Sequence, residues 1–257
     1  MNFISLLQVE KMKIRRSKIL WILFIPVILM WMMAVVNAET NFTMQEYGIS
    51  PENSFFIQSF MGMTWFMIPA TLVVGCVLLQ QTERKNRGMV KMHSLPVSPI
   101  KMCLAKFVVL IGLLAVQMIF MDVVYFAGAA IATKLQSYTF WIDPGIVLRE
   151  TGMIFLASIP MAAAFWMITS LIHTLIVSVG VGFASIVPSV LVVNTKIWFL
   201  YPVCYPLYVV MGKYGELAEN LDMVTIQWIP WIPVAIGLTV LCLMLACIGF
   251  LKEDSIV

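Results

Sequence analysis

The chain has 257 residues, of which 61% are hydrophobic and only 11% are charged, and its mean hydropathy is +0.97. This composition excludes an ordinary soluble domain and indicates a membrane protein. The formal net charge of +3 gives no indication of nucleic-acid binding.

The first eighteen residues place apolar side chains such as Leu6 and Leu7 beside a run of basic ones. This pattern predicts an amphipathic helix that lies in the membrane interface with its cations against anionic headgroups. The alternative is a basic flank that only sets the orientation of the first span.

Six apolar stretches follow, each about as long as the ~20 residues that a membrane-spanning helix needs. We therefore predict an all-α polytopic membrane protein with six transmembrane helices, folded as a single domain over residues 1–257. The stretches are Ile19–Val36, Gln58–Leu79, Ala105–Ala132, Met153–Ile172, Leu175–Val193 and Pro233–Leu251.

The cations between the stretches favour one side of the membrane. If the N-terminus is cytoplasmic, twelve Lys and Arg residues lie inside and only Lys134, Arg149, Lys196 and Lys213 lie outside. The positive-inside rule then predicts a cell-membrane protein with both termini cytoplasmic. The inner set is Lys11, Lys13, Arg15, Arg16, Lys18, Arg84, Lys85, Arg87, Lys91, Lys101, Lys106 and Lys252.

The inner loop Gln80–Leu104 is the densest in cations. A helix over Glu83–His93 would present Arg84, Arg87 and Lys91 on one face, and Leu95-Pro96 would stop it. Such a helix, attached to two spans, suits the transmission of a push from a cytoplasmic partner. The alternative is that these cations only fix topology and contact lipid.

Asp122 is the one acid inside a predicted span. An ionisable group there is costly and marks a candidate functional position. A structural bond to another helix or subunit is one interpretation, with Tyr125 as a possible helper, and a substrate or proton site is the other.

The outer segment Lys196–Ile232 is rich in aromatic residues and interrupted by prolines, which predicts short re-entrant or interfacial helices. Tyr201, Tyr205 and Tyr208 would share one face if the piece were helical, and would then form an outer gate or line the substrate path. Anchoring at headgroup level is the alternative. A full crossing by residues 197–211 is a further alternative.

No catalytic or metal-binding pattern is present in the sequence. There is no Gly-rich nucleotide-binding loop, no metal-ligand spacing and no nucleophile elbow. The chain is therefore not expected to be an enzyme or to hold a cofactor or a metal, and His173 is interpreted as a turn residue.

Together with the six-span pattern, the segment Glu83…Gly88…Ser94-Leu95-Pro96-Val97-Ser98…Lys106 resembles that of ABC-2-type permeases. The resemblance implies a separate cytoplasmic ATPase dimer that binds ATP and magnesium, and a second permease, identical or related. It also implies an ATPase-coupling site in the inner loop, formed by Glu83, Arg84, Arg87, Gly88, Lys91, Leu95 and Pro96.

Within that family the chain is similar in length and character to the permease subunits of lantibiotic-immunity exporters. This narrower resemblance implies export of an amphipathic antimicrobial peptide from the membrane. The alternatives are an exporter of a lipid or drug, a secondary transporter, and a polytopic scaffold or sensor without transport activity.

Overall fold

The computed structural model describes residues 3–15, 17, 19–84, 98–172, 174–217 and 226–254. Every regular element in these ranges is helical, and six helical stretches are long and apolar enough to cross a membrane. The predicted all-α, six-span architecture is confirmed. The six stretches are Ile19–Val36, Pro51–Gln81, Pro99–Gln136, Pro144–Leu171, Leu175–Val192 and Trp228–Leu251.

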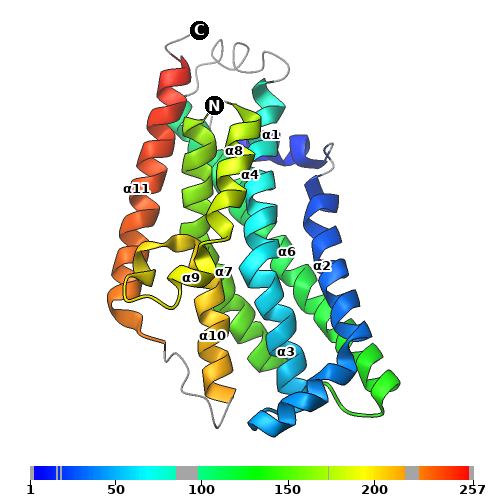
Figure 1. Ribbon diagram of the computed structural model, residues 1–257. Coiled ribbons are helices and arrows are strands. Elements are labelled where there is room, and N and C mark those ends of the chain that lie inside the picture. The colour runs from blue at the N-terminus through cyan, green and yellow to red at the C-terminus, as the bar shows by residue number, and fades with distance from the viewer. Residues whose placement is uncertain are drawn as a thin grey trace.

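Helix α1 (Phe3–Arg15) precedes the first span, α2 (Ile19–Val36). Figure 1 shows α1 at the same end of the bundle as the last turns of α11 (Trp228–Asp254). This end is called the terminal end below. The other end carries η1 (Ala38–Tyr47), which connects α2 to the second span, and is called the distal end.

The second span is one continuous helix made of α3 (Pro51–Gly62), a π-helical turn η2 (Met63–Met67) and α4 (Ile68–Arg84). It begins seven residues before the predicted Gln58, because a proline at the first helical position starts it. Hydropathy marks only the apolar part of such a helix, so it places the start too late.

Helix α6 (Pro99–Gln136) also begins at a proline and extends beyond the predicted Ala105–Ala132. Its 38 residues correspond to about 57 Å of helix, well beyond the ~30 Å of a hydrocarbon core. Figure 1 shows it crossing the bundle obliquely. A helix of this length must tilt or project beyond the hydrocarbon core.

Helix α7 (Pro144–Leu171) forms the centre of the bundle and contacts α4, α6, α8, α10 and α11. Helix α2 lies at the periphery and packs on α6 through one narrow stripe. That stripe repeats every four residues, at Ile19, Leu23, Val27 and Trp31, as one face of a helix requires. Its other face is exposed, with Trp21 and Met32 on the surface.

The chain after α7 is more broken than predicted. Helix α8 (Leu175–Ile186) stops before Pro188, and a short α9 (Ser189–Val192) follows. Two 3-10 turns, η3 (Trp198–Leu200) and η4 (Pro202–Cys204), lead into α10 (Tyr205–Leu217). Figure 1 shows α9 and these turns beside the bundle and α10 descending toward the distal end.

The middle of this segment is buried in the bundle, and its re-entrant course through a membrane stays a prediction. Every residue from Val203 to Val210 is buried, and α10 packs on α7, α3 and η2. The stretch from Val203 to Val210 therefore belongs to the core of the bundle.

Candidate functional site

A buried ion pair attaches α1 to the bundle at the terminal end. The Lys106 ammonium lies 2.9 Å from Oε2 of Glu10, and the two side chains are 0% and 4% exposed. Lys13 Nζ lies 2.7 Å from the other oxygen, Oε1. Both carboxylate oxygens of Glu10 are therefore engaged by cations, one on its own helix and one on α6.

The charge state of Glu10 follows from this arrangement. Burial alone raises the pKa of the carboxyl, but Lys106 and Lys13 act in the opposite direction and hold the pKa below its ordinary value. The ionised form is therefore the one that the folded protein favours at neutral pH.

This ion pair lies close to the predicted coupling loop. Lys106 follows Pro99, the first residue of α6, by seven residues, or about two helical turns. Helix α4, on the other side of the loop, ends at Arg84, so Glu83 and Arg84 lie in its last turn. The remaining coupling residues, namely Arg87, Gly88, Lys91, Leu95 and Pro96, lie outside the described residues, as does the greater part of the predicted Glu83–His93 helix.

Polar contacts also connect α4 and α6 to α7 at the terminal end. Gln80 donates to Thr169 Oγ1 at 3.2 Å and to Ser170 Oγ at 3.0 Å. The Trp166 indole N–H donates to the sulfur of Cys103 at 3.3 Å. These contacts connect the ends of α4 and α6 at the terminal end to the central helix α7.

Asp122 finds its partner on another helix of the same chain. Thr151 of α7 donates to Asp122 Oδ1 at 2.6 Å, and the two residues are 5% and 7% exposed. The suggested help from Tyr125 is not seen, because its buried hydroxyl has no hydrogen-bond partner among the residues that the structure describes. The contact joins α6 to α7.

The three tyrosines of the predicted gate do not form one helical face. Tyr201 precedes the turn η4 and has extended backbone dihedrals, whereas Tyr205 and Tyr208 belong to α10. Their hydroxyls fix different parts of the segment. The Tyr201 hydroxyl donates to Ser185 O, the Tyr205 hydroxyl donates to Phe199 O, and the Tyr208 hydroxyl accepts from the backbone N–H of Gln227.

An aromatic cluster joins the turns, α10 and the start of α11. Trp198 stacks on Tyr208 with ring centroids 3.7 Å apart, and Trp231 makes edge contacts with Tyr205 and Tyr208 at 5.7 Å and 5.4 Å. Trp228 stacks on Trp231 at 5.9 Å. The cluster packs α10 against the start of the last span.

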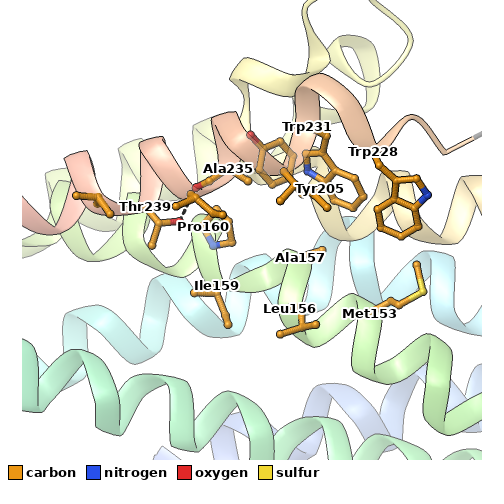
Figure 2. Close-up of a pocket in the computed structure, with 13 residues that line it drawn as sticks. Met153, Leu156, Ala157, Ile159, Pro160, Tyr205, Trp228, Trp231, Ala235 and Thr239 are labelled. Atoms are coloured by element: carbon orange, nitrogen blue, oxygen red, sulfur yellow. Dashed lines mark hydrogen bonds between the residues drawn. The ribbon is translucent and has the colours of Figure 1, made fainter.

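A cavity of about 430 Å³ lies between α7 and α11, next to this cluster. Figure 2 shows α7 residues such as Leu156 and Pro160 on one side and α11 residues such as Ala235 and Thr239 on the other. Several lining side chains are largely exposed, among them Ile236 at 61%. The cavity is therefore a groove that opens sideways. Its lining is Met153, Leu156, Ala157, Ile159, Pro160, Tyr205, Trp228, Trp231, Ile232, Ala235, Ile236, Thr239 and Val240.

Of the three gate tyrosines, Tyr205 lines this groove, while Tyr201 and Tyr208 do not. The described part of the chain holds no group of three or more His, Cys, Asp or Glu side chains that would bind a metal ion. The arrangement can hold an apolar molecule.

A comparison with protein families identifies the chain more closely. A family model described as "ABC-2 family transporter protein" matches residues 6–189, more than half of the chain. The chain belongs to the ABC-2 transporter family. It is therefore a multi-pass membrane component of a transport system, and membership implies partnership with an ABC ATPase. No curated protein matches the chain, and no solved structure does.

The family match covers Glu10 in α1 and Lys106 near the start of α6, whereas α10 and α11 lie beyond it. Sequence reasoning on this ABC-2 protein identified Lys106 as part of a motif but missed its pairing with Glu10. A signal was present: Glu10 is the only acid in a basic helix, and Lys106 lies inside an apolar run.

Proposed function

We propose that this chain is the membrane-spanning permease subunit of an ATP-driven exporter. The separate ATPase would bind ATP and magnesium, dock beneath Gln80–Leu104 and act on the ends of α4 and α6 that flank this loop. The family match supports a transport role. The buried pair of Glu10 and Lys106 supports a rigid connection between α1 and this region.

Orientation is part of the proposal. The terminal end faces the cytoplasm, because the loops at that end carry most of the cations. The distal end, with η1 and the far end of α10, then faces outward. A second permease, identical or related, completes the translocation path.

The family match supports the transport role, and the sideways-opening groove between α7 and α11 indicates that molecules of the bilayer have access to the bundle. Molecules that reside in the bilayer reach such a groove without passing through water. Its apolar lining suits a molecule with a large hydrophobic part. We propose an amphipathic substrate, an antimicrobial peptide cleared from the membrane in lantibiotic self-protection, with a lipid or a drug as the alternative. A peptide would follow the path between the two permeases and not this groove.

Tolerance assays in cells test this function. Cells that carry the chain and its ATPase should survive a higher lantibiotic concentration than cells without the chain. An ATPase whose nucleotide-binding lysine is replaced should remove this protection while the permease stays in the membrane.

A scaffold or sensor would recruit the ATPase without providing protection that depends on ATP hydrolysis. Unchanged tolerance to lantibiotics, together with ATP-dependent efflux of a labelled lipid or drug, would move the assignment to the alternative substrate class.

A further inference from the structure

The groove between α7 and α11 has a shape that restricts what can occupy it. Its α11 wall contains Trp231, Ile232, Ala235, Ile236, Thr239 and Val240, which recur on one face of the helix. Trp231 to Val240 corresponds to about 14 Å along the helix axis. The long dimension of the groove therefore follows the axis of a membrane-spanning helix, the direction in which lipid chains extend.

The groove offers almost no hydrogen bonds to an occupant. Only four lining side chains carry a polar atom: Tyr205, Trp228, Trp231 and Thr239. Thr239 donates to Ala235 O at 2.7 Å and Tyr205 donates to Phe199 O. The indole nitrogen of Trp231 is buried, so only Trp228, 50% exposed, remains at the mouth.

The small number of available polar atoms in the groove favours a hydrocarbon chain over a peptide segment. A peptide segment would bring backbone N–H and C=O groups into the groove and leave them without partners, at a considerable cost for each. A hydrocarbon chain brings no such groups, and each methylene that it buries contributes favourably.

We propose that this groove is a binding site for one acyl chain of a bilayer phospholipid. The chain enters sideways between Leu156 of α7 and Ile236 of α11, which are 63% and 61% exposed. Ala157 and Ala235, on opposite walls, give the groove its depth because their side chains are small. The proposal does not depend on the export function.

The aromatic cluster sets the direction of the bound lipid. Trp228, half-exposed at the first position of α11, marks the end of the groove toward the distal face. Tryptophan favours the headgroup level of a bilayer. The ester end of the lipid therefore lies beside Trp228, and its methyl end points toward Val240.

Photo-crosslinking in nanodiscs tests the site directly. The purified chain is placed in phosphatidylglycerol and phosphatidylethanolamine with a trace of phosphatidylglycerol that carries a diazirine in the middle of one acyl chain. After irradiation, labelled peptides are mapped by mass spectrometry. We expect label at 153–160 and 231–240 in clear excess over the exposed faces of α2 and α8.

Filling the groove supplies the second arm. Ala157→Leu combined with Ala235→Leu should lower labelling of the groove about tenfold. The larger side chains fill volume that several methylenes of the acyl chain would otherwise occupy. Met244→Leu is the matched control, since Met244 is 60% exposed on α11 and does not line the groove. Its labelling should equal that of the unmodified chain.

Three results would overturn the proposal. One is equal labelling of the groove and of the exposed faces of α2 and α8 in the unmodified chain, which decides the matter even where the double variant folds poorly. Another is undiminished labelling in a well-folded double variant. The third is a diazirine-bearing lantibiotic that labels the groove and displaces the lipid, which would assign the groove to the peptide.

Discussion

Glu10 is the residue on which the attachment of α1 depends, because it accepts contacts from Lys106 and Lys13. Glu10→Gln should destabilise the purified protein by about 3 kcal/mol, since it replaces the carboxylate that lies against the buried Lys106 ammonium by a neutral amide. Lys13→Met, at a position that is 28% exposed, should cost less than about 1 kcal/mol. Thermal unfolding in detergent measures both, and equal losses would contradict the buried pair.

The same carboxylate predicts a pH dependence. Its folded pKa lies below the ordinary value of 4.5, so the ion pair contributes fully above that value and loses its contribution as pH falls through the folded pKa. The stability difference between the unmodified chain and Glu10→Gln should therefore be constant from pH 7 to pH 5 and shrink on further acidification. A difference that grew at low pH would contradict this sign.

Asp122 and Thr151 form a second buried contact, between α6 and α7. Asp122→Asn keeps an acceptor oxygen for the threonine hydroxyl, whereas Asp122→Leu leaves that hydroxyl buried without a partner, at about 1–3 kcal/mol. We expect stability and assembly to survive the first change and to suffer from the second. Assembly that survives in Asp122→Asn while transport is lost would show that the charge itself is functional.

At the residue scale, the sequence shows which polar groups lie within apolar segments, where burial is costly. It does not show which partners these groups have. Asp122 was recognisable as an acid within an apolar run, yet its partner is Thr151 and not the nearby Tyr125. Glu10 and Lys106 are 96 residues apart. Such pairings depend on how helices dock, which local patterns do not encode.

At the scale of elements, α8 packs tightly on α4 at one glycine. A Cβ at Gly182 would lie 2.6 Å from Val73 Cγ1, whereas a Cβ at Gly180 would meet nothing within 4 Å. Gly182→Ala should therefore destabilise the protein by about 1–3 kcal/mol through overpacking. Gly180→Ala should be neutral or stabilising by up to about 1 kcal/mol. Matching unfolding temperatures for the two would contradict this packing.

The role of the segment around α10 is best tested with conservative substitutions. Tyr205 and Tyr208 are almost fully buried, so a change of either to alanine would lower the free energy of unfolding by about 3–5 kcal/mol. A loss of tolerance in such a variant would not distinguish poor folding from lost gating. Phenylalanine removes only the hydroxyl, at about 1 kcal/mol. Because each hydroxyl fixes a different part of the segment, a gating role predicts that Tyr201→Phe, Tyr205→Phe or Tyr208→Phe lowers lantibiotic tolerance at normal membrane level. Normal tolerance in all three at normal membrane level would leave only an anchoring role.

The elements themselves were largely predictable, because length and hydropathy determine which segments can span a bilayer. The starts of the second and third spans were not, since Pro51 and Pro99 begin these helices within less apolar sequence. The end of α8 before Pro188 was missed for the opposite reason: an apolar run continues through the break. Hydropathy does not register a change of backbone direction.

For the whole molecule, we propose that an ATPase docks at the terminal end and acts through the loop between α4 and α6. That loop carries Arg84, Arg87 and Lys91. Lys134, Arg149 and Lys196 provide a matched set of three exposed cations elsewhere on the protein. Cysteine labelling on intact cells would confirm that neither set of substitutions changes the topology.

The decisive measurement is co-purification of an ATPase with the tagged chain, identified by its Gly-x-x-x-x-Gly-Lys-Ser/Thr motif and by ATP hydrolysis in the eluate. We expect a stable complex for the unmodified chain and for the variant in which Lys134, Arg149 and Lys196 are changed together to Glu. We expect loss of the complex, and weaker salt dependence of any residual binding, when Arg84, Arg87 and Lys91 are changed to Glu. Isolation of a correctly inserted chain without any ATPase, or equal binding by both triple variants, would contradict the proposal.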